Sequence, residues 1–332
     1  MRRWGKRIGI AVAVIALAYF GIAFGAGMVL NWSLTPGNGD WSGGKPTPSE
    51  PFEIGYHGDP KTALGLDFQT VSYPTEPGPA EAWLVPAATP SKTWAVYVHG
   101  IRGIRENGYK QLSILNQAGI STLMITYRND VGAPSSVPPY YAFGLTEWRD
   151  LDAAIGWALG HGAERIVLVA ESMGGGLAGQ FLVHSDKTKS VVALMLDAPA
   201  LDFPAIADSE IERRHLPTLG ISALALDSAA LTAPVSLSDA VAINAVAAFP
   251  GPLFLAHGSG DQMVPVTISD RLVKMRSAPT VYLRTAADHL ESFKENPDRY
   301  RSEMLAFLKG LGPPERGQAL SLARNFSSQW MS

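Results

Sequence analysis

A serine flanked by small residues follows an apolar run in the stretch RIVLVAESMGGGLAG, residues 165–179. The segment AESMG at 170–174 matches a small-x-Ser-x-small turn between a strand and a helix. Such a turn exposes the serine hydroxyl, here that of Ser172, at the end of the strand, where a neighbouring base can activate it as a nucleophile. The stretch therefore predicts covalent catalysis at Ser172.

The same stretch has a second interpretation, a dinucleotide-binding loop. Gly174, Gly176 and Gly179 form G-x-G-x-x-G, and Asp197 follows Gly174 by 23 residues, as a ribose-binding acid would. A pyrophosphate site needs its first glycine directly at the end of the first strand of a βαβ unit. Here other residues intervene after the apolar run, and earlier strands precede it. We therefore favour the serine turn, in which the glycines allow close packing of the following helix.

Two polar residues follow later strands in the chain order of a hydrolase triad. Asp261 lies in FLAHGSGDQMVP (254–265), and His289 lies in TAADHLESF (285–293) after the last apolar run. The histidine can accept the serine proton, and the aspartate can orient the imidazole and stabilise its cation. Asp197, at the end of the preceding strand, is the alternative acid.

Backbone amides near the serine can stabilise the negative charge of a tetrahedral intermediate. The stretch VYVHGIRG at 96–103 follows an early strand, and the amide of Ile101 comes directly after its His-Gly pair. Met173 follows the serine at the predicted start of a helix and supplies a second amide. Three nearby polar residues are interpreted as turn-forming or supporting residues rather than proton-transfer groups: His99, His257 and Glu171.

The elements that must position these residues alternate between apolar runs and amphipathic stretches. Residues 68–74 and 81–86 flank a turn and predict a hairpin. Continuous apolar runs predict strands that are covered on both faces, at 93–98, 121–126, 165–169, 191–196, 253–256 and 280–284. Helical spacing follows at 148–159 and at 300–308, the latter after a cap at Asn296 that precedes a proline. The pattern predicts an α/β fold with helices covering the sheet.

One connection is longer than the others: residues 198–250 lie between two predicted strands and are rich in alanine and leucine. Its length exceeds that of an ordinary connection and predicts a cap inserted over the site. The apolar segment LGISALALDSAALTAPV within it would bury acyl carbons well. We place the catalytic domain at 52–311, and we treat 312–332 as a peripheral C-terminal tail.

The N-terminal region predicts a membrane anchor. Residues 1–7 contain four basic side chains and no acid, and residues 8–30 are 23 positions without a charge. As a helix this run is about 34 Å long, enough to cross a hydrocarbon core of about 30 Å. The basic residues predict a single-pass protein of the cytoplasmic membrane, with its N-terminus inside, its catalytic domain outside and the Pro/Gly/Ser-rich stretch 31–51 as a linker. A cleaved signal peptide is the alternative, although its apolar region is usually shorter.

The composition of the 332 residues excludes several other classes of protein. The chain has no cysteine, which excludes disulfides, catalytic thiolates and cysteine-bound zinc, and it has no HExxH motif. Its formal net charge is −3, and its basic residues beyond residue 7 are scattered, so nucleic acid is not a predicted partner. We predict no metal and no organic cofactor.

These motifs together resemble those of the α/β-hydrolase family. The likeness covers roughly residues 53–310 and is carried by Ser172 in its turn, His99-Gly100, His257-Gly258-x-x-Asp261 and Asp288-His289. The sequence is most similar to the serine aminopeptidase and lysophospholipase-like branch, and especially to membrane-anchored actinobacterial hydrolases with a DHLESFKENPDRY-type ending. The resemblance implies an eight-stranded sheet, helices on both faces and a cap after the sixth strand. Because that branch has mixed functions, the resemblance implies no particular substrate.

The sequence therefore predicts a membrane-anchored serine hydrolase, esterase- or lipase-like, that cleaves a carboxylic ester or lipid-like acyl substrate through an acyl-enzyme. Its partners would be a small acyl substrate and the bilayer around residues 8–30, while acyl chain length and oligomeric state stay open. A serine peptidase or aminopeptidase is the nearest alternative. A catalytically silent tethered domain that binds a cell-envelope ligand is the alternative outside the enzymes, although such a domain has no chemical need for all three triad residues.

Overall fold

In the computed structural model, which describes residues 2–38, 46–215 and 220–312, the strands form one sheet in the order β1-β2-β4-β3-β5-β6-β7-β8. These strands are β1 (Gln69–Thr75), β2 (Gly78–Val85), β3 (Thr93–Val98), β4 (Ser121–Ile125), β5 (Arg165–Glu171), β6 (Val191–Asp197), β7 (Leu253–Gly258) and β8 (Thr280–Thr285). β2 pairs antiparallel with β1 and β4, and the other pairs are parallel. The predicted eight-stranded, mostly parallel sheet is confirmed.

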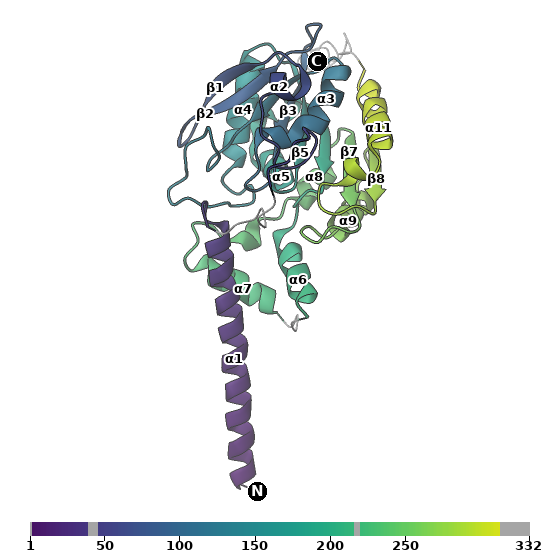
Figure 1. Ribbon diagram of the computed structural model, residues 1–332. Coiled ribbons are helices and arrows are strands. Elements are labelled where there is room, and N and C mark those ends of the chain that lie inside the picture. Colours follow the sequence, from purple (N-terminus) through teal and green to yellow (C-terminus); the bar gives the residue numbers. More distant parts are fainter. Residues whose placement is uncertain (1, 39–45, 216–219, 313–332) are drawn as a thin grey trace, which may run out of the picture.

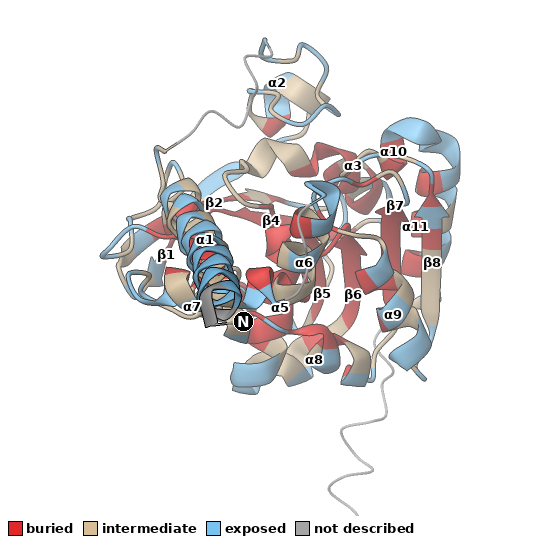
Figure 2. Ribbon diagram, turned by 90° about the horizontal axis from the view of Figure 1, so that it is seen from below, coloured by how far each residue is buried: buried red, intermediate tan, exposed pale blue. Residues whose placement is uncertain are grey.

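Two hydrophobic cores lie on opposite faces of this sheet, and β3 contributes alternate residues to both. Val96 and Val98 belong to one core, and Ala95 and Tyr97 belong to the other. The first core contains residues of α4 (Trp148–Gly160), α5 (Met173–His184), α8 (Ile243–Ala248) and α9 (Thr267–Met275). The second contains residues of α3 (Tyr109–Gln117), α10 (Ser292–Glu295) and α11 (Pro297–Gly310), with α2 (Pro60–Leu64) packed at its edge. Figure 2 shows the central strands buried between these layers.

The strand and helix boundaries follow local chemistry. β4 and β7 are buried at every position, as expected of strands with both faces covered. The edge strand β1 instead exposes most of its residues. At the start of α11 the side chain of Asn296 accepts a hydrogen bond from the backbone N–H of Arg299, and a proline occupies the first turn, so the predicted helix cap is present.

The cap is inserted between β6 and β7, as predicted. It contains α6 (Phe203–Arg213), α7 (Ile221–Ala230), the short 3₁₀ turn η3 (Leu237–Asp239) and α8. The other 3₁₀ turns in the described residues are η1 (Arg105–Gly108) and η2 (Asp186–Ser190). In Figure 1, α6 and α7 extend from the domain on the side where the N-terminal helix leaves it.

The N-terminal helix α1 (Arg2–Leu34) is long and apolar enough to cross a membrane. Its segment Lys6–Leu34 has a mean hydropathy of 2.3 in its most apolar window, and 6% of that window is buried. The helix continues into the stretch predicted as a linker, and Leu34 lies in a core of the domain, with 2% of its surface exposed. The last turn of α1 is thus part of the folded domain, while residues 39–45 of the predicted linker and 313–332 of the predicted tail lie outside the described residues.

Candidate active site

Ser172 lies in the tight turn between β5 and α5, at the carboxyl edge of the sheet. Its φ of 52° and ψ of −124° are unusual for a residue with a side chain, and they are the strained geometry that exposes a nucleophilic serine. Neighbouring segments hold the turn: the backbone N–H of Ser172 donates to Asp197 O at 3.0 Å, and Ser172 O accepts from Ala200 N at 2.9 Å. The sequence AESMG therefore forms the turn that its small residues predict.

The glycines after Ser172 are packed against neighbouring protein atoms. A Cβ on Gly174 would lie 2.5 Å from the carbonyl oxygen of Val98, and one on Gly176 would lie 2.9 Å from that of Phe143. A Cβ on Gly179 would lie 2.4 Å from the Cβ of Ala242. The glycines of the G-x-G-x-x-G pattern thus allow α5 to approach its neighbours, and the space that a pyrophosphate would need is filled.

The structure brings Ser172, His289 and Asp261 into one chain of hydrogen bonds. His289 Nε2 lies 2.9 Å from Ser172 Oγ, and His289 Nδ1 lies 2.6 Å from Asp261 Oδ2. Because an ionised carboxylate only accepts, Nδ1 carries the proton, and Nε2 of the neutral ring is left as an acceptor for the serine hydroxyl. Each residue follows a different strand, β5, β7 and β8, so the sheet sets their relative positions.

Asp261 is held as a carboxylate by several donors. Its Oδ1 accepts from the backbone N–H groups of Met263 at 2.8 Å and Val264 at 2.9 Å, and its Oδ2 also lies 3.1 Å from His257 Nε2. Burial raises the pKa of this carboxyl, but hydrogen bonds from His257 and His289 and from the backbone amide of Val264 outweigh burial and hold the pKa below its ordinary value. The acid beside His289 is therefore ionised at neutral pH.

Asp197, the alternative acid, lies elsewhere. Its side chain is buried, its Oδ2 accepts from the Tyr300 hydroxyl at 3.1 Å, and the same oxygen lies 3.8 Å from Lys110 Nζ. The hydrogen-bond partner of His289 Nδ1 is Asp261. The geometry therefore favours Asp261 as the acid.

The two residues predicted to donate oxyanion amides flank the serine. A Cβ on Gly100 would lie 2.8 Å from the Cβ of Ser172, so the backbone just before Ile101 touches the serine. Met173 is the first residue of α5, and the first N–H groups of a helix have no partner within it. Both amides are thus in segments that meet at Ser172, and their role stays a prediction.

His99 supports the loop that contains Ile101. Its ring is fully buried, with Nδ1 2.8 Å from Gly100 O and Nε2 3.0 Å from Asp130 Oδ2, and it stacks on Tyr127 at 4.5 Å. Burial lowers the pKa of His99, but the charge of Asp130 and the two acceptors outweigh burial and raise the pKa above its ordinary value. Nδ1 faces a backbone oxygen and Nε2 lies within ion-pair distance of a buried carboxylate, an arrangement that favours the charged form of His99. The sequence analysis missed Asp130, because no local pattern connects it with His99.

A second buried cluster lies behind the serine. Lys110 Nζ is 3.6 Å from Glu171 Oε2 and donates to the backbone oxygen of Leu290 at 3.1 Å. Leu290 directly follows His289 and has a positive φ of 59°. Burial raises the pKa of Glu171, and the charge of Lys110 opposes that shift. Lys110 therefore connects the histidine loop with the residue that precedes the serine, a contact that no local pattern predicts.

Metal binding has no candidate site within the described ranges. Residues 2–38, 46–215 and 220–312 contain no group of three or more His, Asp or Glu side chains that could hold a metal ion. The histidines nearest Ser172 are engaged as described above, His257 through Ser269 Oγ at 2.7 Å as well as through Asp261.

Comparisons with known proteins agree with this architecture. No protein-family model matches the sequence. The uncharacterized protein YfhR of Escherichia coli (strain K12) is 26% identical over 272 residues, which cover 78% of this chain and 85% of YfhR. The esterase Pf2001 of Pyrococcus furiosus has a similar structure, with a TM-score of 0.61, 20% identity and coverage of 81% of this chain and 98% of the esterase. A puromycin-hydrolyzing peptidase of Mycobacterium tuberculosis gives a TM-score of 0.56 at 17% identity, with coverage of 74% of this chain and 40% of that protein.

The sheet order, the helices on both faces, the cap after β6 and these structural neighbours define the class. The chain has the α/β-hydrolase fold. The fold predicted from the motifs is confirmed, and the polar residues after β5, β7 and β8 meet at the edge of the sheet where such folds bind ligands.

Proposed function

We propose that this chain is a serine hydrolase in which Ser172 is the nucleophile, His289 the general base and Asp261 the acid that orients the base. The observation that carries the proposal is the pair of hydrogen bonds that joins them, 2.9 Å from Oγ to Nε2 and 2.6 Å from Nδ1 to Oδ2. The similarity to an esterase and a peptidase with the same fold supports a hydrolase. The strained turn at Ser172 supports the same assignment.

The reaction proceeds in two steps. As Ser172 Oγ bonds to the substrate carbonyl carbon, its proton moves to His289 Nε2. When the tetrahedral intermediate collapses, the bond to the leaving group breaks and the leaving group takes that proton, which leaves an acyl-enzyme. Water then attacks the acyl carbon, gives a proton to Nε2, and the carboxylic acid departs as Ser172 regains its hydrogen. Asp261, ionised throughout, stabilises the imidazolium that forms in each step.

The negative charge on the substrate oxygen would be held by the amides of Ile101 and Met173. Each such donor contributes roughly 3 kcal/mol to transition-state stabilisation in comparable sites. His99 contacts the carbonyl oxygen of Gly100, next to Ile101, and so helps to hold this loop in place. This arrangement suits acyl transfer to water.

An ester or lipid-like acyl compound is the proposed substrate class. The cap that follows β6 contains the apolar helix α7, and buried apolar surface favours acyl carbons over charged peptide ends. We further propose that α1 anchors the enzyme in the cytoplasmic membrane with the N-terminus inside, since its length and hydropathy suit a membrane span and basic residues precede it. Peptide hydrolysis is the second candidate, favoured by the similarity to the puromycin-hydrolyzing peptidase.

Labelling with a fluorophosphonate probe tests the proposed nucleophile. Folded wild-type protein should label, and Ser172→Ala protein with an unchanged melting temperature should not. Undiminished labelling of that variant would refute the assignment, and no labelling of the wild type would favour a silent binding domain. Turnover of p-nitrophenyl esters of increasing chain length, measured beside aminoacyl nitroanilides, then separates an esterase from a peptidase.

A further inference from the structure

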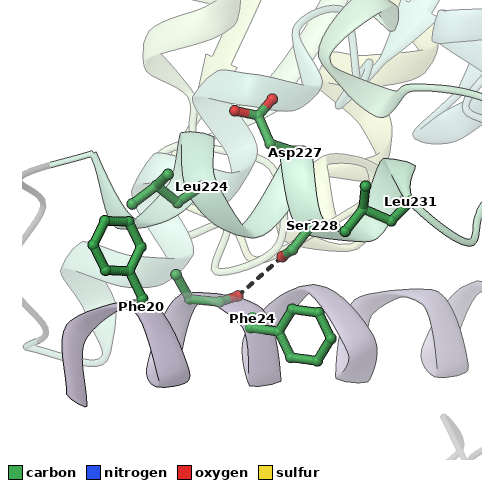
Figure 3. A pocket seen from close by; sticks show the side chains of 7 residues that line it. Phe20, Phe24, Leu224, Asp227, Ser228 and Leu231 are labelled. Carbon is green, nitrogen blue, oxygen red and sulfur yellow. Dashed lines mark hydrogen bonds between the residues drawn. The ribbon is translucent and has the colours of Figure 1, made fainter. Parts of the chain in front are cut away.

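The membrane-length helix α1 and the cap helix α7 lie side by side (Figures 1 and 3). Ala23 and Gly27 of α1 are buried, and a Cβ on Gly27 would lie 2.3 Å from Ser228 Oγ and 2.4 Å from the carbonyl oxygen of Ala225. The absence of a side chain at Gly27 thus allows the two backbones to approach closely.

Polar contacts hold the two helices together near the C-terminal end of α1. Asn31 Nδ2 donates to Ala229 O at 2.7 Å and to Thr232 Oγ1 at 2.8 Å. The Tyr140 hydroxyl donates to Asn31 Oδ1 at 2.9 Å, so the domain reaches the same residue. The cap, α1 and the domain therefore meet at Asn31.

The position of α7 along α1 places it within the depth of a bilayer. Leu224 of α7 and Phe20 of α1 line one apolar groove of about 340 Å³ (Figure 3). The charge-free part of α1 begins at Ile8, and a helix from Ile8 to Phe20 is only about 20 Å long. A hydrocarbon core is about 30 Å thick. A bilayer that α1 crosses must therefore also surround part of α7.

The aromatic residues of α1 suit the same placement. Trp4 and Trp32 are both largely exposed, 74% and 56%, and 28 positions of helix between them correspond to about 42 Å. That distance matches the separation of the two interfacial regions where tryptophan is enriched, about 40–45 Å. Trp32 would then mark the interface on the side of the catalytic domain. The α7 contacts at Ala23 and Gly27 lie between Trp4 and Trp32, that is, on the bilayer side of this interface.

The outward surface of α7 is mostly apolar. Leu231, directly after the helix, is 75% exposed, and Ala223 and Ala230 are exposed as well. Asp227 is the exposed charged residue of this surface, and it points away from α1 in Figure 3.

The end of α1 is also joined to the candidate active site. Arg102 Nη2 donates to Ser33 O at 2.7 Å and to Thr35 O at 2.9 Å, which places a cation on the carbonyl end of the helix. Arg102 directly follows Ile101, whose amide is the proposed oxyanion donor. The loop beside Ser172 is therefore bound to the membrane helix itself.

We propose that α7 lies against α1 within the leaflet on the side of the catalytic domain, and that the site takes its acyl substrate as an amphiphile resident in that leaflet. The part that concerns the substrate rests on the proposed hydrolase function. The part that concerns α7 does not, so the two can be tested separately.

Depth-dependent quenching tests the position of α7. Because the chain has no cysteine, Leu231→Cys and Val183→Cys each introduce one thiol for a bimane label. Val183 is a matched control, since it is 51% exposed near the end of α5, at the far edge of the sheet from Ser172. In full-length protein reconstituted in phosphatidylglycerol/phosphatidylethanolamine vesicles, spin-labelled acyl chains should quench the label at 231 and aqueous iodide should not. The label at 183 should behave oppositely.

Quenching of the Leu231→Cys label by iodide and not by spin-labelled lipid would overturn the membrane contact. This readout does not depend on catalysis and can be repeated in Ser172→Ala protein. Lipid quenching without fluorophosphonate labelling would refute the hydrolase and leave the placement of α7 intact. Fluorophosphonate labelling without lipid quenching would support the hydrolase and refute the placement of α7 in the leaflet.

A pair of glycine substitutions tests the supply of substrate. Gly27→Leu introduces a side chain where α7 packs, while Gly25→Leu points into open space on the same helix. We expect Gly27→Leu to push α7 away from α1 and so to lower turnover of a long-chain p-nitrophenyl ester held in vesicles by about tenfold, with turnover of soluble p-nitrophenyl acetate largely kept. Gly25→Leu should leave both rates near wild type. Equal losses for both esters in Gly27→Leu, or no loss, would overturn the proposed route from the leaflet.

Discussion

Two histidine–aspartate pairs near the carboxyl edge of the sheet differ in what the second ring nitrogen faces. In the pair His289–Asp261, that nitrogen faces the hydroxyl of Ser172 at 2.9 Å, so it is placed beside the proton that the proposed reaction transfers. In the pair His99–Asp130, it faces the backbone oxygen of Gly100 at 2.8 Å, which can only accept a hydrogen bond and so favours a proton on that nitrogen. We call the first the mobile pair, because His289 is proposed to take up and release a proton, and the histidine of the second the fixed cation, because its surroundings favour the charged ring.

Solvent access reinforces that difference. The His289 side chain is 11% exposed and the His99 side chain is not exposed at all. A fully buried ring has no route for exchanging its proton with substrate, whereas part of the His289 side chain reaches the surface. The contrast teaches that the partner of the second nitrogen, rather than the aspartate, decides which histidine can act as a base.

The largest expected effect concerns the acid of the mobile pair. Asp261→Asn removes the carboxylate that fixes the tautomer and stabilises the cation of His289, and a comparable change in other triads lowers kcat by about 10⁴-fold. Asp197→Asn, which alters a buried aspartate that His289 does not contact, should cost far less activity. Steady-state turnover of a p-nitrophenyl ester, with melting temperatures as the folding control, checks the ranking. The reverse order would place the acid after β6.

The second effect concerns the fixed cation. His99→Gln removes the charge that balances Asp130 in a buried position, and breaking a buried pair in this way costs about 3–5 kcal/mol of folding free energy. Denaturant unfolding of the two proteins measures the difference. Replacement of both members, His99→Gln with Asp130→Asn, should recover part of the loss because no lone buried charge remains. A single variant as stable as wild type would show that His99 is neutral in the folded protein.

How much of the structure could be predicted from the sequence depends on whether the contacts are local or distant along the chain. β3 was predicted at its observed limits, and the turn at Ser172 was predicted from five residues, because apolar runs and small residues act locally. Lys110 and its contact with Leu290 could not be predicted, since 180 residues separate them and a lysine in an amphipathic helix normally faces solvent. The docking of α1 on α7 was also missed, because Asn31 and Ala229 are 198 positions apart. The extension of α1 to Leu34 was also missed, because the apolar run that predicts the membrane span ends at Leu30, although no proline interrupts the helix before Pro36.

The two pairs should also give opposite dependences of stability on pH. The pKa of His99 is raised by Asp130 against the effect of burial, so its contribution is fully present below the unfolded pKa of about 6.5 and is lost as pH rises through the folded value. The pKa of Asp261 is lowered by its hydrogen bonds against burial, so its contribution is present above the unfolded pKa of about 3.9 and is lost as pH falls through the folded value.

The measurement is the difference in unfolding free energy between wild type and each variant as a function of pH. The difference between wild type and His99→Gln should shrink on the alkaline side, and the difference between wild type and Asp261→Asn should shrink only in acid. A difference in unfolding free energy for His99→Gln that grows with rising pH would contradict the fixed-cation assignment, because it would show that the neutral ring of His99 is the more stabilising form.

The smallest expected effect comes from the aromatic ring that packs on His99. The Tyr127 hydroxyl donates to Gly100 O at 2.9 Å, the same oxygen that faces His99 Nδ1. Tyr127→Phe removes this donor and keeps the stacked ring, so stability should fall by about 1 kcal/mol, as for the loss of one hydrogen bond. Because His99 still holds Gly100 O, the adjacent Ile101 amide should keep its place and kcat should change less than in His99→Gln. Unfolding and turnover of both variants under one set of conditions decide the matter: a larger loss of kcat in Tyr127→Phe would mean that the tyrosine hydroxyl, rather than the imidazolium, holds this loop in position.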